Sequence, residues 1–395
     1  MVEFLTVVND QGAERRINSL FVRFQEISKN SVDAHFYDWD SIWRALVNMG
    51  IYRRGADVAE VGTTWLESLV AMNALRPFSP AEVDMLGSQE AFIPETWGAT
   101  SIHGDARVWG IPARCDVRVV WYWKDMLEQA KVDAATGFAD LQSLQETLEK
   151  LKAVLAMPWV MTIARDDPNI IQTLATWIWA CKGEFVTPDC KKVSLLEPNA
   201  LKALQAYFGL YQYMSKDTLD LSSNEIAELF FERKTAAIFG GPWVLTELRQ
   251  RRILGNQLAR IGIAPTPGPP FVGGTVLTIP RHVRNIQPSM EFIKFMMMPE
   301  IQVAYCPPVG LLPTTHKAWE SPIMQEDPFN RVIYQAFENG RGLPTVALWG
   351  MVEEKLKSSI YQIWKDLLWN PGTTIDQAIQ THLEPTVRRL NISLQ

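Results

Sequence analysis

The stretch AAIFGGPWVLTEL, residues 236–248, places a strand signal directly before a helix signal. Small and apolar residues at its start predict a short buried strand over 236–239. Two glycines then permit close backbone approach, and Pro242 suits the first position of a helix. Trp243 is therefore predicted in a first helical turn. In α/β sheets the end of such a strand faces the ligand crevice, so Trp243 is either a ligand platform or a plug between strand and helix.

Strand and helix signals alternate along the rest of the chain. Near the start, FLTVV and VDAHFYDW read as strands, WDSIWRALVNMGI as a helix, and ADVAEVGTTW as a strand that runs into a loop. A second series begins with a strong strand over 117–123 and includes a hairpin over 181–192. This alternation predicts βαβ units, an α/β fold and mostly parallel sheets flanked by helices.

The chain of 395 residues is longer than one core usually holds, which predicts two domains. Extended proline-bearing segments near 110–114, 262–267 and 309–314 would let the chain cross between two lobes and form a hinge. The expected lobes are 1–112 with 265–312, and 113–264 with 313–395, with a ligand cleft between them.

Bulk composition excludes several classes of partner. Hydrophobic residues make up 47% and charged residues 21%, as in ordinary globular proteins. The net charge is −6 and no long lysine/arginine block occurs, so no nucleic-acid partner is expected. No apolar run is long enough to cross a bilayer. MVEFLTVVND opens directly into a strand, as expected of a cytoplasmic protein or of a chain whose signal has been removed.

Motifs for catalysis, metals and cofactors are absent from the sequence. It lacks GxxxxGK[ST], GxGxxG, HExxH and GxSxG, and its four cysteines form no CxxC pair, so no cofactor and no metal are expected. A glycosidase with two facing acids stays open. Cys181 and Cys190 flank the predicted hairpin, and a local disulfide between them is an alternative in an oxidising compartment.

Tryptophan is abundant, and several of its 15 copies lie on predicted crevice loops. Sugar rings have apolar C–H faces that stack on aromatic planes, while their hydroxyls need polar groups at the rim. Asp116 and Arg118 alternate along one strand, so both would point to the same side. They are either ligand contacts or a structural ion pair.

Six stretches occur in an order that resembles the family 1 extracellular solute-binding proteins, the maltose-binding-protein-like sugar receptors of ATP-binding cassette importers. They are ADVAEVGTTW, GIPARCDVRVVWYWKDML, TAAIFGGPW, VGGTVLTIP with MEFIKFMMMPEIQ, and VGLLPTT. The likeness runs from Phe4 to about Leu390. It implies a two-lobe periplasmic-binding-protein fold that closes on a ligand. It also implies a monomeric, non-catalytic, extracytoplasmic carrier that delivers a sugar or oligosaccharide to a transmembrane permease.

The resemblance also implies a set of ligand contacts. Residues 167–169 fall where some relatives place an acid and an aromatic residue, and this chain departs from that pattern with Asn169. The position near Trp349 could slip by one. Two alternatives remain: a non-sugar solute such as a polyamine, glycerol-phosphate compound or amino-acid derivative, and a carbohydrate-active enzyme. Arg114, Arg118 and Arg165 would favour an anion if they converge. The implied contacts are Asn9, Asp10, Thr64, Trp65, Asp116, Arg118, Asn169, Trp243, Gly273, Gly274 and Trp349.

Overall fold

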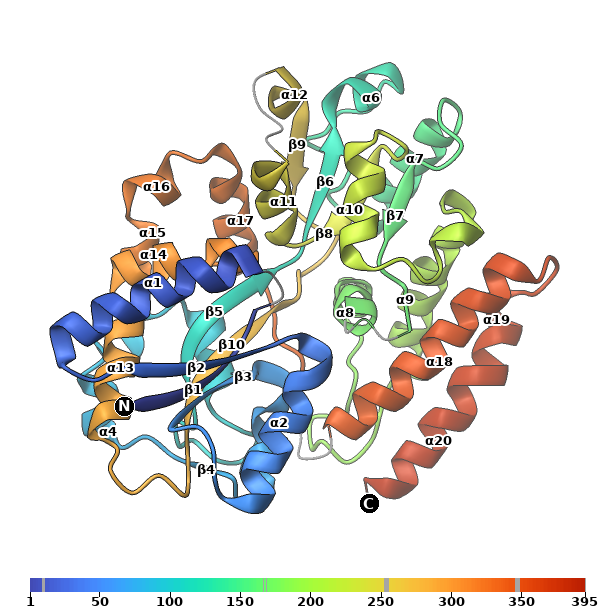
Figure 1. The fold of residues 1–395 in the computed structure, drawn as a ribbon. Helices are drawn as coiled ribbons and strands as arrows, with labels where there is room; N and C mark the ends of the chain where they lie inside the picture. Colours follow the sequence, from blue (N-terminus) through green and yellow to red (C-terminus); the bar gives the residue numbers. More distant parts are fainter. Residues whose placement is uncertain (9–10, 166, 168, 252–255, 345–348, 395) are drawn as a thin grey trace. The chain divides into compact units, whose positions relative to one another are not determined.

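The structure is a computed structural model that describes residues 1–8, 11–165, 167, 169–251, 256–344 and 349–394. The chain divides into two compact units (Figure 1). Unit 1 comprises Met1–Asp116, Val272–Arg331 and Thr345–Trp349, and unit 2 comprises Val117–Phe271, Val332–Pro344 and Gly350–Gln395.

Residues 313–331, which the sequence analysis assigned to the second lobe, pack in unit 1. The reason is a set of hydrogen bonds at Thr314, whose hydroxyl donates to the carbonyl of Pro112 at 2.8 Å. Its backbone N–H donates to the side chain of Gln302 at 3.0 Å. The two earlier boundaries lie a few residues beyond the predicted crossings. That the units act as hinged lobes stays a prediction.

Unit 1 is built on a six-stranded sheet in the order β2-β1-β3-β10-β4, with β5 paired to β10. β1 is parallel to β2 and to β3, while β10 is antiparallel to β3 and to β4. The register pairs Val2 with Val32 and Phe4 with Val58. The strands are β1 (Val2–Val7), β2 (Val32–Tyr37), β3 (Val58–Gly62), β4 (Leu75–Arg76), β5 (Ile111–Val117) and β10 (Val272–Pro280).

Helices cover both faces of this sheet because alternate strand residues point to opposite sides. Phe4 joins a core with Phe21 and Phe292 from α1 and α13, and Leu5 joins a second core with Ile42 and residues of α3. Figure 1 shows α1 and α2 on these two sides of β1. The helices are α1 (Gln11–Ser28), α2 (Trp39–Tyr52), α3 (Leu66–Ala71), α4 (Pro80–Asp84), α5 (Pro94–Trp97), α13 (Gln287–Met296), α14 (Pro299–Tyr305), α15 (His316–Trp319) and α16 (Pro322–Gln325).

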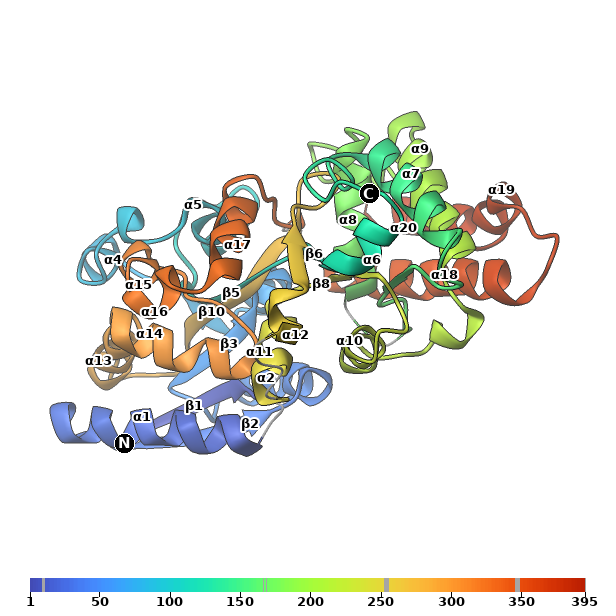
Figure 2. The same cartoon turned by 90° about the horizontal axis from the view of Figure 1, so that it is seen from above.

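Unit 2 is built on a four-stranded sheet in the order β7-β8-β6-β9, packed on aromatic-rich helices (Figure 2). Trp177 of α8 contacts Phe239 of β8 and Tyr207 of α9. The strands are β6 (Val119–Trp123), β7 (Trp159–Met161), β8 (Ala237–Gly240) and β9 (Ile261–Ala264). The helices are α6 (Lys124–Gln129), α7 (Leu141–Lys152), α8 (Asn169–Ala180), α9 (Pro198–Gly209), α10 (Ser223–Phe231), α11 (Trp243–Gln250), α12 (Asn256–Ala259), α19 (Ile375–Ala378) and α20 (Glu384–Ser393). Two helices span the boundary between the units, α17 (Pro328–Glu338) and α18 (Trp349–Trp369).

The predicted α/β class is confirmed, but the sheets are mixed rather than mostly parallel. β7 is parallel to β8, whereas β6 is antiparallel to β8 and to β9. The antiparallel strands β6 and β10 each follow an extended segment that passes from one unit to the other. Parallel neighbours are usually connected by a helix that crosses the face of their sheet. Neither β6 nor β10 is reached through such a helix.

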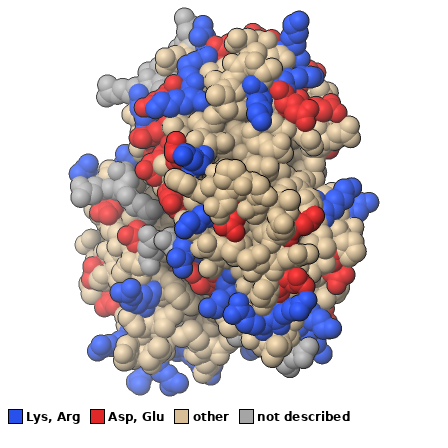
Figure 3. Space-filling model, turned by 90° about the vertical axis from the view of Figure 1, so that its right-hand side faces the viewer, with Lys and Arg blue, Asp and Glu red and all other residues tan. Residues whose placement is uncertain are grey.

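Three further predictions concern surface features. The hairpin region carries an antiparallel bridge between Val186 and Val193. No disulfide joins Cys181 to Cys190, so the structure does not contain the alternative bridge. No described helix has the length and apolar character required to span a bilayer. On the face shown in Figure 3, basic and acidic side chains are interspersed.

Candidate functional site

Trp243 occupies the position that the sequence predicts. β8 ends at Gly240, Pro242 caps the helix, and α11 begins at Trp243 itself. Gly240 lies in a tight space, because a Cβ there would approach Val244 to 3.0 Å. The indole of Trp243 is half-buried. The strand–turn–helix arrangement of 236–248 is thus confirmed, and it places a partly exposed indole at the carboxyl end of β8.

Arg118 supports this indole. The guanidinium carbon lies 4.7 Å from the ring centroid of Trp243 and 5.4 Å from that of Phe271. One guanidinium nitrogen donates hydrogen bonds to the side-chain oxygens of Asn169 and Gln172 in α8. The side chain is only 1% exposed. Arg118 therefore lies inside unit 2 and holds the indole by packing and by cation–π attraction.

Asn169 is held by a second set of hydrogen bonds. Its amide nitrogen donates to Oδ1 of Asp167 at 2.6 Å and to the hydroxyl of Ser223 at 2.8 Å. Ser223 in turn donates to Oδ2 of Asp167 at 2.9 Å. These bonds turn the Asn169 carbonyl oxygen toward Arg118. The network joins the first turns of α8, α10 and α11, next to the carboxyl ends of the parallel strands β7 and β8.

The structure therefore brings together three of the predicted contacts of unit 2: Arg118, Asn169 and Trp243. Sequence reasoning missed Gln172 and Phe271. Gln172 lies one helical turn after Asn169, a spacing that could have indicated it. Phe271 is distant in sequence, and no local pattern places it beside Arg118.

In unit 1, Trp65 belongs to an aromatic cluster with Trp39 and Trp43. Its ring centroid lies 5.8 Å from that of Trp39 and 5.5 Å from that of Trp43. All three side chains are half-buried. Trp39 is the first residue of α2, after the N-cap Asp38, whose carboxylate accepts from the backbone of Ser41 at 2.8 Å. We call these three side chains the Trp39–Trp43–Trp65 cluster.

Trp65 ends a single 3₁₀ turn, Thr63–Trp65, directly after β3, and the predicted contact Thr64 lies in the same turn. Sequence reasoning missed Trp39 and Trp43. Their i, i+4 spacing at the start of a predicted helix was the available signal, since such residues share one face. Their contact with Trp65 depends on the pairing of β1 with both β2 and β3, which is not a local property of the sequence.

Arg114 lies in a buried network below this edge of the sheet. It forms an ion pair of 2.5 Å with Glu60, and both side chains are at most 1% exposed. Glu60 also accepts from Thr6 at 2.5 Å and from Tyr305 at 2.9 Å. Burial raises the pKa of the Tyr305 hydroxyl. The expectation that Arg114 would help to hold an anion is therefore not supported, because its charge is balanced within the core.

The structure explains why β10 carries a glycine at position 274, in the pair Gly273 and Gly274. Gly274 has a φ of +130°, and a Cβ there would lie 2.1 Å from the carbonyl oxygen of Arg114. Only glycine lets β10 approach β5 this closely. Gly273 is its buried neighbour. A ligand contact at either glycine stays a prediction.

The remaining predicted contacts differ in their surroundings. Asp116 is 9% exposed near the end of β5 and is the last residue of the first segment of unit 1. Trp349 is fully buried at the start of α18, which differs from the partial exposure of Trp65 and Trp243. Asn9 and Asp10 lie outside the described residues.

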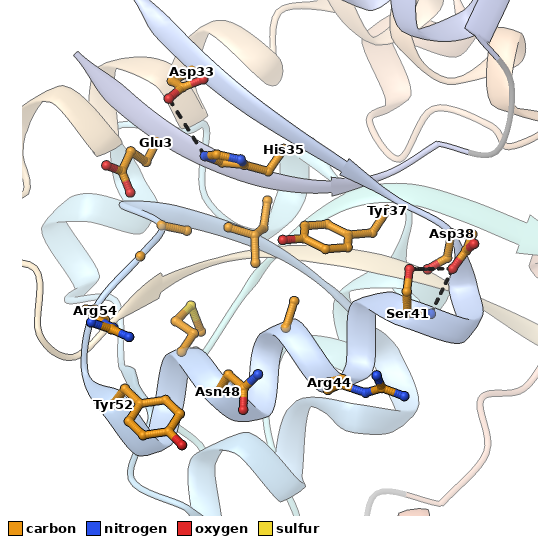
Figure 4. Close-up of a pocket in the computed structure, with 15 residues that line it drawn as sticks. Glu3, Asp33, His35, Tyr37, Asp38, Ser41, Arg44, Asn48, Tyr52 and Arg54 are labelled. Carbon is orange, nitrogen blue, oxygen red and sulfur yellow. Dashed lines mark hydrogen bonds and ion pairs between the residues drawn. The ribbon is translucent and has the colours of Figure 1, made fainter.

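A groove of about 900 Å³ lies elsewhere in unit 1, between α2 and the edge strand β2 (Figure 4). Asp33 and His35 approach to 3.8 Å on the strand, and Arg44 and Asn48 face it from the helix. The charged side chains of the groove are of both signs and most are exposed. It is the solvated side of a sheet edge that α2 does not cover.

Comparisons with known proteins identify the class of protein to which this chain belongs. The family of bacterial extracellular solute-binding proteins matches residues 20–331. The chain belongs to this family, which confirms the resemblance seen in the sequence.

Relatives and solved structures agree with this assignment. A maltooligosaccharide ABC transporter solute-binding lipoprotein of Streptococcus pneumoniae strain R6 is 24% identical over 278 residues. The match covers 65% of this chain and only 61% of that relative. The sugar-binding protein MalE of Xanthomonas citri superposes with a TM-score of 0.83 at 19% identity, covering 100% of this chain and 97% of the other. UgpB of Mycobacterium tuberculosis, in complex with glycerophosphocholine, gives 0.79 at 17% identity, with 100% and 99% covered. At these identities the structural likeness shows the fold.

Proposed function

We propose that this protein is a non-catalytic carrier that binds a sugar or oligosaccharide outside the cytoplasm and delivers it to the permease of an ABC importer. The observation that carries the proposal is the half-buried indole of Trp243, held from inside the unit by Arg118 at the carboxyl end of β8. An indole fixed in this way stacks on the C–H face of a pyranose ring without first losing side-chain freedom.

The polar surroundings of Trp243 suit a neutral ligand. Arg118, whose guanidinium packs over the indole, is buried and donates to two amide oxygens. Arg114 is neutralised by Glu60. Hydroxyl groups require hydrogen-bond partners rather than a net charge, and amide and carboxylate groups such as those of Asn169 and Asp167 supply them.

A non-sugar solute is the second candidate, favoured by the glycerophosphocholine complex of the tuberculosis relative. Such a phosphodiester would require a cationic group that is free to form charge-assisted hydrogen bonds. Arg165, which is exposed, is the remaining one of the three arginines that the sequence analysis named. The buried positions of the other two make a sugar the better-supported ligand.

The proposal is tested by isothermal titration of the protein with maltose, maltotetraose and glycerophosphocholine. We expect binding of the sugars in the micromolar range, about −8 kcal/mol, which is ample for a carrier. Chromatography of maltotetraose after prolonged incubation checks catalysis, and we expect the sugar to be recovered intact. Binding of glycerophosphocholine alone would replace the proposal with the second candidate, and shortened sugar products would replace it with an enzyme.

In this proposal residues of both units contact the ligand, among them Asp116, Asn9 and Asp10, and the units close on it about a hinge. Ligand contacts would stabilise the closed state, and the closed carrier would present a different surface to the permease than the empty carrier does. The carrier acts as a monomer.

A further inference from the structure

Four arginines lie at one edge of the unit 1 sheet, the edge where the parallel strands β1 and β3 begin. Arg53 and Arg54 lie between α2 and β3, so they precede the amino end of β3. Arg281 and Arg284 follow β10, which is antiparallel to β3, so the end of β10 lies beside the start of β3. Figure 1 shows the end of α2 and the loop from β10 to α13 on the same side of unit 1.

The turn between α3 and β4 connects these two pairs of arginines. The backbone N–H of Arg281 donates to the carbonyl of Ala74 at 2.8 Å, and its guanidinium donates to the side chain of Asn73. Gly50 of α2 packs on the same turn, because a Cβ there would lie 2.8 Å from the Cβ of Ala74. The end of α2, with Arg53, and the start of the loop after β10 therefore meet at one turn.

The charges of these four arginines are not balanced by ion pairs. All four side chains are exposed, and within the described residues none of them forms an ion pair. Arg76 of the same unit, in contrast, forms an ion pair of 2.7 Å with Glu82. Glu3 and Asp57 bring carboxylates to the same edge, but Asp57 accepts from the backbone N–H of Glu3 at 2.9 Å. The arginines therefore carry positive charge that the negative groups of a partner can neutralise.

Apolar side chains are exposed among the arginines. Ile51 and Tyr52, at the end of α2, are 61% and 62% exposed. The guanidinium carbon of Arg54 lies 5.6 Å from the ring centroid of Tyr52, and Figure 4 shows both side chains at this end of the helix. Met72 is exposed in the turn on which Gly50 packs. We call this surface the basic edge, formed by Arg53, Arg54, Arg281, Arg284, Ile51, Tyr52 and Met72.

We infer that the basic edge is a contact surface for the anionic phospholipids of a membrane. Negative headgroups would neutralise the arginines, while Ile51, Tyr52 and Met72 would enter the headgroup region. Arginines on two separate loops suit a plane of phosphates better than one bound anion. The inference rests on the proposed function, in which the carrier delivers its ligand at a membrane. Because the basic edge lies where β1 and β3 begin, unit 1 would contact lipid without covering Trp65 at the carboxyl end of β3.

The test is sedimentation of the protein with vesicles of phosphatidylcholine, either alone or mixed with an equal amount of phosphatidylglycerol. We expect binding to the mixed vesicles only, and weaker binding as salt is added, because salt screens exposed charges. In Arg54→Gln/Arg284→Gln the partition coefficient should fall at least about tenfold, from about fivefold for each arginine near an anionic surface.

Arg15→Gln/Arg16→Gln is the matched control, because it removes the same charge from two exposed arginines of unit 1. These arginines lie in α1, which follows the carboxyl end of β1 and thus the opposite edge of the sheet. The control should bind the mixed vesicles like the parent. Equal losses in the two variants would reduce the effect to net charge and overturn the inference.

Two more variants examine the chemistry of the contact. Arg54→Lys/Arg284→Lys keeps the charge and should retain most of the binding. Ile51→Ser/Tyr52→Ser should weaken binding, because it removes side chains that enter the headgroup region. Full displacement from the mixed vesicles by millimolar inorganic phosphate at constant ionic strength would indicate a site for a soluble anion and overturn the inference.

Isothermal titration with maltotetraose separates this inference from the proposed function. The variants of the basic edge should bind the sugar like the parent and unfold at the same temperature. A parent that binds maltotetraose but not the mixed vesicles overturns the membrane contact alone. A parent that binds the mixed vesicles but no sugar supports the membrane contact and overturns the proposed function.

Discussion

At the scale of single residues, Trp243 and Arg118 show how one buried side chain fixes the position of another. Arg118 donates hydrogen bonds to Asn169 and Gln172, and its guanidinium packs over the indole of Trp243. Its predicted alternation with Asp116 does not hold along one strand, because β5 ends at Val117 and β6 begins at Val119. The arginine that follows the break turns into unit 2 and fixes Trp243.

Replacing Trp243 should therefore affect binding more than folding. We expect Trp243→Ala to weaken sugar binding by about 1–3 kcal/mol, the value of one stacked aromatic contact. The free energy of unfolding should fall by less than the roughly 3–5 kcal/mol that removal of a fully buried aromatic costs. Titration calorimetry and denaturant unfolding measure the two quantities. A large loss of stability with unchanged affinity would identify Trp243 as a plug in the core.

Asp116 presents the choice that the sequence left open, between a ligand contact and an ion pair. For a ligand contact, Asp116→Asn should weaken binding by about 1.5–3 kcal/mol, the scale of a hydrogen bond to a charged group. The thermal unfolding midpoint of the unliganded protein should stay within a few degrees of the parent. If the midpoint falls and the affinity does not, the carboxylate serves the fold.

At the scale of elements, local sequence patterns predicted the positions of strands and helices better than they predicted how the strands pair. The order of small residues, glycines and proline in 236–248 was enough to predict β8, the turn and α11, because each step is a local preference. Strand direction is not a local property, so the prediction of mostly parallel sheets did not anticipate the antiparallel pairing of β6 and β10. Trp39 and Trp43 were missed for the same reason: the contact between α2 and the end of β3 exists only after the sheet has formed.

Because β10 approaches β5 closely, we expect one added methyl group at Gly274 to lower the stability of the fold strongly. Gly274→Ala places a Cβ 2.1 Å from the carbonyl oxygen of Arg114, at a φ that L-residues rarely adopt. We expect a loss of at least about 3 kcal/mol in the free energy of unfolding, since the strand must shift. Gly98→Ala is the control, because it has a helical φ of −54° and open space around it. Urea unfolding that gives equal stabilities for the two variants would contradict this account.

Helix α18 carries a carboxyl group whose burial makes stability depend on pH. Glu353 is 6% exposed, and loss of hydration raises its pKa to about 7, with Lys357 opposing and Glu354 reinforcing the rise. The folded protein therefore holds this proton more tightly than the unfolded chain, in which the pKa is 4.5. The stabilisation is present below about pH 4.5 and is lost as the pH rises toward 7.

Glu353→Gln should remove this dependence, because glutamine resembles the protonated acid. At pH 8 the variant should be more stable than the parent by up to about 3 kcal/mol, from 1.36 kcal/mol per pKa unit. At pH 4.5 the two should be nearly equal. Denaturant unfolding across this range measures the difference. Glu338→Gln, at an exposed position at the end of α17, is the control and should show little change. A constant difference at every pH would mean that Glu353 is not buried as a neutral acid.

At the scale of the whole molecule, the chain passes from unit 1 to unit 2 between Asp116 and Val117 and returns between Phe271 and Val272. The first of these passages lies within β5 and the second directly precedes β10, and the chain changes unit again after Arg331 and after Trp349. The family assignment, together with the partly exposed Trp65 and Trp243 in separate units, leads us to predict that the units close on the ligand as rigid bodies. Small-angle scattering should show a smaller radius of gyration at saturating maltotetraose than without sugar. Trp243→Ala is the control, measured at a sugar concentration that saturates the parent but lies below the Kd of the variant. Most molecules of the variant then carry no ligand to stabilise the closed state, so the radius of gyration should stay that of the unliganded protein. An unchanged radius in the saturated parent, with binding verified by calorimetry in the same sample, would rule out closure and leave capture without a hinge movement.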